Sequence, residues 1–268
     1  MPDRISAKIF RYIPSIDSEP TYKTYEIPWR EYITVLEVLK YIHECFEPIS
    51  FDWGCRIARC GTCGVRVNNK PCLACVTLVS PGEILIEPLD NLSIVRDLIV
   101  DRTQVNEVLY SIDPWLCRSA PLAEVPTLSY EAYEKLEALQ LCIDCLLCHS
   151  ICPVVKSEGI TKFAGPNIML KIAMRYYDPR DEAKDKRLQT AVKLGLMKCN
   201  LCGACAEVCP QGYHDDSQQH IQVEHMLGFT TPKAGLLDAD QAYARRFSVE
   251  LPIDHLFILE DLQKKAKQ

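Results

Sequence analysis

Several features are missing from this sequence, and each absence excludes a class of function. It has no run of 18 apolar residues that could cross a membrane as a helix, and no glycine-rich loop of the kind that binds phosphates. Its net charge is −6, whereas a general nucleic-acid binder is normally basic. It also has no set of acid, base and nucleophile residues typical of a hydrolase. We therefore expect no nucleic-acid partner and name no catalytic residue.

The N-terminal segment, MPDRISAKIFRYIPSID, alternates polar and apolar residues and has no apolar core like that of a secretory signal. This predicts a cytoplasmic protein. Of the 268 residues, 48% are hydrophobic and 25% are charged, which are the proportions of an ordinary globular protein. The chain is long for a single hydrophobic core, so we expect about two domains.

Cysteine, in contrast, is abundant, with 15 residues. In a secreted protein this number would indicate disulfides, but in a reducing cytosol closely spaced cysteines more often bind metal. The spacing of the cysteines then indicates which metal group they bind. Most of them fall into three groups along the chain.

The first group lies in FDWGCRIARCGTCGVRVNNKPCLAC, where Cys55, Cys60 and Cys63 have the spacing Cx4CxxC. This is the spacing of plant-type ferredoxins, in which a loop surrounds one face of a [2Fe-2S] cluster and a later cysteine completes the ligand set. Glycines between the cysteines suit a loop whose amides approach the inorganic sulfides closely. By spacing alone, both Cys72 and Cys75 are candidates for the fourth ligand.

The second and third groups repeat one pattern, CxxCxxCxxxCP, 57 positions apart: CIDCLLCHSICP and CNLCGACAEVCP. This is the pattern of bacterial two-cluster ferredoxins, whose first three cysteines bind one [4Fe-4S] cluster while the fourth binds the other. By this likeness, one cluster has the ligands Cys142, Cys145, Cys148 and Cys209, and the other has Cys199, Cys202, Cys205 and Cys152. Zinc is the alternative metal, although zinc sites usually have two CxxC pairs rather than triplets that end in Cys-Pro.

The region before residue 105 has the pattern of a half-buried sheet with one helix. We expect strands over residues 4–13, 21–29 and 76–89, a hairpin turn at Asn68 and Asn69, and a helix over residues 34–46 that begins with the capping-box pair Thr34 and Glu37. The cysteine loop lies between the helix and the hairpin. Together these elements predict a β-grasp ferredoxin domain over residues 1–105.

After this region the apolar residues recur at helical spacing. We expect helices over residues 93–112, 129–141 with Ser129 as the cap, 166–177, and 181–194 with Gly195 at the end. The charge run DPRDEAKDKR is expected to be solvated because its signs are mixed. His149 is expected to lie exposed in a loop, because cysteines already fill the ligand positions. The overall prediction is an α+β protein with an α-helical domain over residues 106–268 that carries two cubane clusters.

In the content and order of its motifs, the sequence resembles the iron–sulfur subunit of succinate dehydrogenases and fumarate reductases. The likeness covers nearly the whole chain and rests on CRIARCGTCGVRVNNKPCLAC, NLSIVRDLIVDRTQVNEVLYSIDPWL, CIDCLLCHSICP, GPNIML, DPRDEAKDKRL and CNLCGACAEVCP. Because the LAC of the family matches at Cys75, the resemblance implies Cys75 rather than Cys72 as the fourth [2Fe-2S] ligand. We expect the remaining cysteines, Cys45, Cys72 and Cys117, to be small buried hydrophobic side chains.

The resemblance implies an electron-transfer subunit without substrate chemistry of its own. Its cofactors would be one [2Fe-2S] and two [4Fe-4S] clusters, with FAD on a partner subunit. Its partners would be this FAD-containing catalytic subunit, where fumarate and succinate interconvert, and a quinone-reactive membrane-anchor subunit. The chain would then be peripheral, on the cytoplasmic side of the cytoplasmic membrane.

The sequence departs from the common form of the family at three places. Cys202 stands where an isoleucine or valine is usual, and where the third cluster is therefore [3Fe-4S]. A thiolate at this position predicts a [4Fe-4S] cluster with a lower reduction potential, suited to a menaquinone or thiol-linked pool. Ser157 and Asn200 replace a tryptophan and a histidine, which points to a different membrane subunit as the electron exit. Ala58 replaces a glycine in the first cysteine loop.

Two other functions are compatible with the cysteine pattern. The first is the iron–sulfur subunit of another flavin- or thiol-dependent oxidoreductase, of the glycolate oxidase or heterodisulfide reductase type. Those families generally have no β-grasp domain ahead of the double run, and they usually carry a CCG motif that this sequence does not have. The second is a zinc-stabilised interaction module. Brown colour, iron content and acid-labile sulfide distinguish it from the others.

Overall fold

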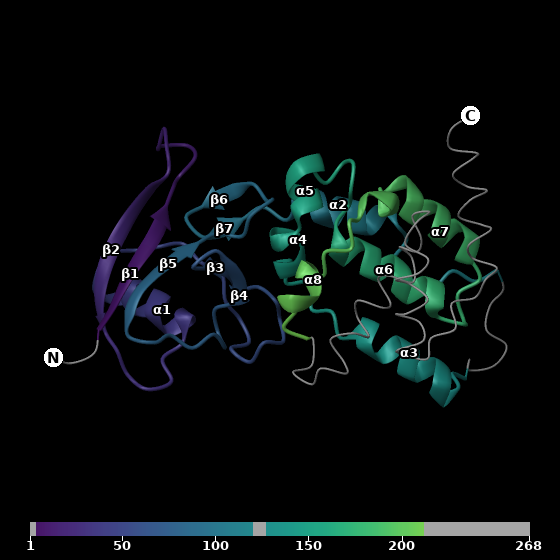
Figure 1. Cartoon of the computed structure of the whole chain (residues 1–268), viewed down its shortest axis with the longest axis horizontal. Coiled ribbons are helices and arrows are strands. Elements are labelled where there is room, and N and C mark those ends of the chain that lie inside the picture. Colours follow the sequence, from purple (N-terminus) through teal and green to yellow (C-terminus); the bar gives the residue numbers. More distant parts are fainter. Residues whose placement is uncertain (1–3, 120–126, 212–268) are drawn as a thin grey trace.

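The structure, a computed structural model, describes residues 4–119 and 127–211. A β-rich part at the N-terminal end lies beside a helical part (Figure 1). Within the described ranges, no helix is both long enough and apolar enough to cross a membrane. Residues 212–268, which include much of the predicted second domain, lie outside the described residues.

The N-terminal part is built on a five-stranded mixed sheet with the order β2-β1-β5-β3-β4. Its strands are β1 (Arg4–Arg11), β2 (Thr21–Pro28), β3 (Gly64–Val67), β4 (Lys70–Leu73) and β5 (Gly82–Glu87). The β1–β5 pair is parallel, and the other pairs of this sheet are antiparallel. The predicted hairpin turn is confirmed, with Asn68 and Asn69 at φ 48° and 67°.

One helix, α1 (Val35–Cys45), packs on this sheet. It begins as predicted with a capping box, in which Glu37 N donates to Thr34 Oγ1 at 3.3 Å and Thr34 N donates to Glu37 Oε2 at 2.9 Å. Its apolar face, which includes Leu39 and Ile42, is buried in one core with strand residues such as Ile5. The helix and sheet form the expected β-grasp arrangement, and Gly61 of the cysteine loop lies against Ile143 and Cys145 of the helical part.

The prediction of a helix over residues 93–112 is wrong for the first half of that range. Residues 94–100 form a small antiparallel hairpin, β6 (Ile94–Arg96) and β7 (Ile99–Val100), and helix α2 (Thr103–Ser111) begins only afterwards. The cause is Asp97, which has φ 47° and a fully buried carboxylate. This carboxylate accepts hydrogen bonds from Arg11 Nε (3.1 Å), Tyr12 N (3.1 Å) and Ser50 N (3.0 Å). Apolar periodicity cannot reveal a turn held by such distant partners.

The C-terminal part is helical. Its elements are α3 (Tyr130–Gln140), α4 (Leu147–Ile151), α5 (Pro153–Glu158), α6 (Pro166–Tyr177), α7 (Lys184–Lys193), the 3-10 turn η1 (Leu196–Lys198) and α8 (Ala204–Glu207). Helix α6 lies between α3 and α7 in Figure 1, and α2 also packs against it. The predicted caps are confirmed: Ser129 Oγ accepts from Ala132 N at 3.2 Å, and Gly195 at φ 87° ends α7.

The charge run DPRDEAKDKR is not simply a solvated helix start, as predicted. Asp178, Asp181 and Arg187 in it are buried. Arg187 Nη2 lies 2.8 Å from Asp181 Oδ2, and the same guanidinium donates to the carbonyl oxygens of Ile112 (2.8 Å) and Asp113 (2.7 Å). These charges therefore fasten the connector after α2 to helix α7, and this pairing makes their burial tolerable.

One large hydrophobic core extends through both parts of the described chain, and a smaller cluster of Leu136, Leu139 and Leu170 lies between α3 and α6. The large core includes residues of the sheet, residues of α6, and Leu98 and Val105 between them. The division into residues 1–105 and 106–268 stays a prediction. Helix α2 spans this boundary and packs on α6, so the two predicted domains are closely joined in the structure.

The buried Asp97 carboxylate yields a stability prediction. We expect D97N to lower the free energy of unfolding by about 3 kcal/mol, because the mutation leaves Arg11 with a weakened buried partner. Anaerobic urea unfolding, followed by circular dichroism, measures this change. The matched control is E26Q, which removes an exposed carboxylate from β2 and is expected to change stability by no more than about 0.5 kcal/mol. Equal effects of the two mutations would contradict the assigned role of Asp97.

Candidate iron–sulfur ligand groups

The first cysteine loop directs backbone N–H groups at its own thiols. Cys55 Sγ accepts hydrogen bonds from the backbone N of Ile57 (3.4 Å), Arg59 (3.2 Å) and Cys60 (3.3 Å). Hydrogen bonds of this kind stabilise a thiolate, and around a bound cluster they also adjust the reduction potential. The loop is therefore preorganised for a negatively charged sulfur ligand.

The pKa values in this group show which thiols lie together. Hydrogen bonds from the Cys55 backbone and from Thr62 lower the pKa of Cys60 to about 6. Burial, together with the neighbouring thiols of Cys75 and Cys60, raises the pKa of Cys63 to about 12. The structure thus brings Cys75 beside Cys63, and Cys60 beside both Cys55 and Cys63.

Cys72, the competing candidate, lies in different surroundings. Burial raises the pKa of its thiol, and the groups that oppose this rise are Thr77, Lys70 and the backbone of Val67. None of these groups is a cysteine. In the described residues, Cys75 is therefore the one of the two candidates that lies with the other thiols of the loop.

Ala58 does not distort the first loop. It adopts φ 54°, the left-handed conformation that a glycine would take at no cost, and Arg56 does the same at φ 62°. The carbonyl oxygen of Ala58 accepts a hydrogen bond of 3.1 Å from Gln211 Nε2, which belongs to the segment after the third cysteine group. The loop therefore keeps a conformation suited to glycine although the sequence departs from the family here.

The second and third groups fold alike. In the second, Asp144 and Leu146 have positive φ (52° and 63°), and helix α4 starts directly after them. In the third, Leu201 and Gly203 have positive φ (58° and 77°), and helix α8 starts at the same point. These residue pairs are 57 positions apart, as are the cysteines. In each group the second cysteine, Cys145 or Cys202, lies between the two left-handed residues.

The thiols of these two groups also cross over in space. The pKa of Cys145 is raised to about 12 by burial first, with further contributions from Cys209 and Cys142. The same neighbours act on Cys148, whose pKa lies well above its ordinary value because of burial. Cys209, the last cysteine of the third run, therefore lies with the first three cysteines of the second.

The reciprocal crossing involves Cys152. Burial first, and then the thiols of Cys199, Cys152 and Cys202, raise the pKa of Cys205 to about 12. Burial also raises the pKa of Cys152, with contributions from Cys199 and Cys202. The last cysteine of the second run thus lies with the first three of the third, and Cys202 lies among them although it is exposed.

The donor set suits iron–sulfur clusters. All twelve predicted ligands are free cysteines, arranged in three groups that the structure gathers from distant parts of the chain. In the part of the chain that the structure describes, no three His, Cys, Asp or Glu side chains converge on a point where a single metal ion could be held. A cluster of several irons is larger than one ion and is held by thiolates that are further apart.

Two of the remaining cysteines differ from the prediction that they are buried hydrophobic side chains, whereas Cys72 agrees with it in part, because it packs against the hydrophobic core. Cys45, at the end of α1, is exposed, which contradicts the prediction. Cys117 is half-buried and accepts a hydrogen bond of 3.2 Å from Arg187 Nη2, so it is a polar contact of the connector. Cys72 is half-buried on β4.

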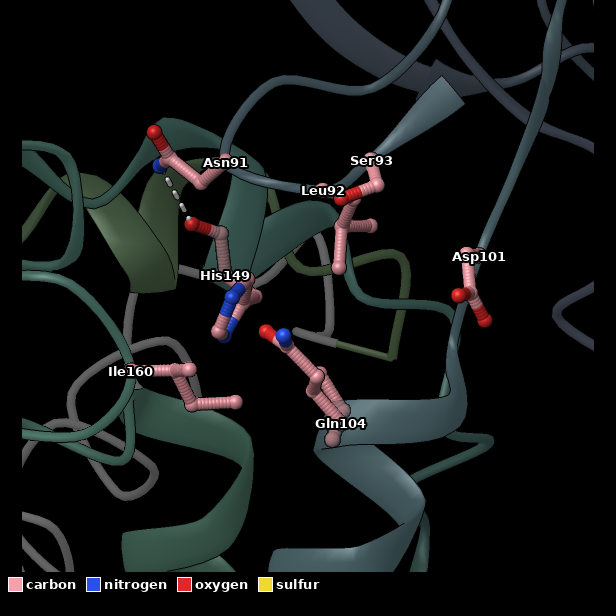
Figure 2. A pocket seen from close by; sticks show the side chains of 8 residues that line it. Asn91, Leu92, Ser93, Asp101, Gln104, His149 and Ile160 are labelled. Atoms are coloured by element: carbon pink, nitrogen blue, oxygen red, sulfur yellow. Dashed lines mark hydrogen bonds between the residues drawn. The ribbon is translucent and has the colours of Figure 1, made fainter. Parts of the chain in front are cut away.

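His149 is not the exposed loop residue that was expected. Its side chain is fully buried and lines a cavity of about 260 Å3 together with Asn91, Ser93, Asp101 and Gln104. Figure 2 shows its ring directed towards Gln104. Neither ring nitrogen has a hydrogen-bond partner among the described residues. Burial lowers the pKa of His149 more than the nearby Asn167 raises it.

Asn91 is a residue of the site that the cysteine pattern did not indicate. It has φ 64°, and its Nδ2 donates to the carbonyl oxygens of His149 (2.9 Å), Ser150 (3.0 Å) and Cys152 (3.3 Å). The first of these bonds is drawn in Figure 2. Asn91 thereby ties the first domain to the end of α4, where the second run reaches Cys152. The only hint in the sequence is that asparagine tolerates positive φ.

Comparison with known families agrees with this arrangement. The family described as "2Fe-2S iron-sulfur cluster binding domain" matches residues 6–107, and the family described as "4Fe-4S dicluster domain" matches residues 138–213. The protein is therefore of the iron–sulfur class, with a [2Fe-2S] β domain followed by a helical dicluster domain.

Relatives narrow this class to one family. The chain is 36% identical over 225 residues to the fumarate reductase iron-sulfur subunit of Mycobacterium tuberculosis, a match that covers 79% of this chain and 88% of that protein. It is also 36% identical over 230 residues to the Haemophilus influenzae subunit of the same name, with 77% and 87% covered. The chain belongs to the family of electron-transfer iron–sulfur subunits of fumarate reductases and succinate dehydrogenases.

A longer sequence relative and a solved structure are also similar to this chain. The chain is 37% identical over 208 residues to a subunit of the fumarate reductase (CoM/CoB) of Methanothermobacter marburgensis, a match that covers 77% of this chain but only 41% of that longer protein. A chain in the structure titled "Mycobacterium smegmatis Sdh1 complex in the apo form" has a TM-score of 0.70 at 23% identity, covering 85% of this chain and 97% of that one. This second likeness shows the fold.

The left-handed conformation of Ala58 can be tested. We expect A58G to raise the free energy of unfolding by about 1 kcal/mol, because a non-glycine residue in this conformation is strained. The [2Fe-2S] absorption should also be lost at a higher urea concentration. As a control, the same change at Ala191, inside helix α7, is expected to destabilise the protein by about 1 kcal/mol. A destabilising effect of A58G would contradict the left-handed backbone conformation assigned to Ala58.

Proposed function

We propose that this chain carries single electrons between a FAD-containing catalytic subunit and a quinone-reactive membrane-anchor subunit of a succinate dehydrogenase or fumarate reductase complex. It would lie peripherally on the cytoplasmic side of the cytoplasmic membrane. The observation that carries the proposal is the placement of the second cysteine group between the other two. Cys148 has neighbours in the third group, and the second group's loop packs on Gly61 of the first loop.

When bound, iron–sulfur clusters take up and release single electrons with little change in geometry. The chain would supply the rest of the function. Its first loop would hold a [2Fe-2S] cluster through Cys55, Cys60, Cys63 and Cys75, and the crossed groups would hold two cubane clusters through the remaining eight ligands. Burial of thiols such as Cys145 and Cys148 keeps water away from these sites. It also raises their pKa, so these thiols are protonated while no metal is bound and lose their protons when metal binds.

We further propose that Cys202 binds a fourth iron, so that the third cluster is [4Fe-4S] rather than [3Fe-4S]. The support is the matching backbone of the two runs, which gives Cys202 the same place between left-handed residues as Cys145. The nearness of its thiol to Cys205 and Cys152 supports the same conclusion. An additional thiolate should lower the potential of this cluster, which suits exchange with a menaquinone or thiol-linked pool.

C202V tests this ligand. We expect the anaerobically purified wild-type protein to contain about ten irons, the sum of one [2Fe-2S] and two [4Fe-4S] clusters, and the variant to contain about one fewer. The oxidised variant should show the paramagnetic signal of a 3Fe cluster, and the potential of that cluster should rise. Iron analysis and paramagnetic resonance measure both effects.

The matched control is C45V, which removes another exposed thiol and should leave iron content and spectra unchanged. A 3Fe signal in the wild-type protein under strict anaerobiosis would contradict the role of Cys202. Zinc in place of iron, or far less iron than three clusters need, would contradict the whole proposed function.

The first loop also offers a surface for the flavoprotein partner. Beside Cys55, the side chains of Trp53 and Ile57 are 42% and 68% exposed. The guanidinium of Arg56 lies 4.4 Å from the centre of the Trp53 ring, and Lys40 Nζ lies 5.4 Å from it. Exposed aromatic and apolar groups next to arginine are typical of protein interfaces. We propose that this patch, Lys40, Trp53, Arg56 and Ile57, contacts the FAD-containing subunit.

I57E tests the patch. A buried carboxylate in an apolar contact is costly, so we expect the recovery of co-purifying flavoprotein to fall about tenfold or more. The control I16E places the same charge on Ile16, which is 76% exposed in the turn between β1 and β2. It should leave recovery unchanged. Purification of the native complex under low salt, with the flavin quantified by absorbance, provides the measurement. Equal recovery with both variants would exclude this patch as the contact.

A second candidate function is an iron–sulfur subunit of another flavin- or thiol-dependent oxidoreductase. The observation that favours it is the 37% identity to the fumarate reductase (CoM/CoB) chain of Methanothermobacter marburgensis. Two residues near the third group agree with an electron exit unlike that of familiar members. Ser157 is exposed, and its Oγ donates a hydrogen bond of 3.3 Å to the Val154 carbonyl oxygen; Asn200 is also exposed. Identification of the proteins that co-purify with the chain distinguishes the two functions.

A further inference from the structure

The loops of the first and second cysteine groups touch through their backbones. Gly61 has φ 69°, and a Cβ atom added there would lie 2.4 Å from Ile143 O and 3.0 Å from Cys145 Cα. A side chain at this position would force the loops apart. Gly61 stands between Cys60 and Cys63, and Ile143 stands between Cys142 and Cys145. The contact therefore lies between residues that directly flank proposed ligands of two different clusters.

One side chain bridges this contact. Arg102 Nη2 donates to the carbonyl oxygen of Gly61 at 3.2 Å, and Nη1 of the same guanidinium donates to the carbonyl oxygen of Asp144 at 3.2 Å. The planar guanidinium carries several donors in a fixed arrangement, so one arginine can hold two carbonyl groups at once. Arg102 is itself placed at the start of α2, where the Asp101 carboxylate accepts from Thr103 N at 2.8 Å.

The charge of Arg102 is not neutralised by an ion pair within the part of the chain that the structure describes. The nearby Lys171 differs, since its Nζ lies 3.0 Å from Asp144 Oδ2. The hydrogen bond of Arg102 to the Asp144 carbonyl oxygen holds its charge beside the backbone next to Cys145. A fixed positive charge close to thiolate-bound iron stabilises the reduced state, because reduction adds negative charge.

We propose that Arg102 is a positioning residue for electron passage between the two domains. It holds the Gly61 and Asp144 loops together, and its charge raises the reduction potential of the cluster held by Cys142, Cys145, Cys148 and Cys209. This inference rests on the proposed function, because it assumes clusters at these ligands.

Two variants separate the charge from the bridge. R102Q removes both, while R102K keeps the charge but has no second planar donor arm to hold both carbonyls. In an anaerobic redox titration followed by paramagnetic resonance, we expect R102Q to make the second cluster about tenfold harder to reduce at a fixed potential, a shift of about 59 mV for one electron. R102K should leave this potential near the wild-type value.

The bridge has a separate measurement. Hydrogen exchange at the amides of residues 61–64 and 143–147 should become several-fold faster in both R102Q and R102K, because both lose the double hydrogen bond. R4Q, which removes an exposed arginine at the start of β1, is the control and should change neither potential nor exchange.

Three results would overturn the proposal. They are an unchanged potential in R102Q, an equal drop in R102K, and an equal shift of the third cluster, which would indicate a general structural change. If R102Q fails to assemble, R102K still tests the bridge by hydrogen exchange, and a lowered potential in R102K would contradict the role of the charge. Iron and sulfide analysis of the wild-type protein comes first, so a failure of the proposed function appears as missing clusters rather than as unchanged potentials.

Discussion

Closely spaced thiols are buried together in this protein, and the rest of the structure depends on making that burial tolerable. Burial raises the pKa of Cys63, Cys145 and Cys205 to about 12, so without metal these thiols stay protonated. Metal binding requires thiolates, and it therefore releases protons and stabilises the fold at the same time. The ligand loops are short and have little helix or strand of their own, which makes their conformation dependent on the groups they hold and on neighbouring elements.

The protein supports these loops in two ways. Within a loop, backbone N–H groups point at sulfur, as at Cys55, and left-handed residues turn the chain sharply between ligands. Between loops, Asn91 holds the carbonyls at the end of α4, and the buried Asp97 fixes the hairpin from which α2 departs. The last cysteine of each run, Cys152 or Cys209, lies beside the first three cysteines of the other run, and Gly61 contacts the second run. The three cysteine groups therefore lie in series over a continuous apolar core.

Cysteine spacing, capping residues and turn residues by themselves determined much of this protein. The Cx4CxxC group, the doubled CxxCxxCxxxCP run, the Thr34–Glu37 capping box and the Asn68–Asn69 turn are local patterns, and local patterns persist whatever surrounds them. The resemblance to a family, rather than spacing, indicated Cys75 over Cys72, and in the structure the Cys75 thiol lies beside Cys63.

Tertiary structure alone decided the features that join distant segments. The apolar periodicity of residues 93–100 suggested a helix, but the buried bonds of Asp97 to Arg11 and Ser50 impose a hairpin. The same applies to the burial of His149 and to the bridge made by Arg102. These three features depend on residues that are distant in the sequence, either as hydrogen-bond partners or as the residues that bury a side chain. A pattern within a short window of sequence cannot specify such distant residues.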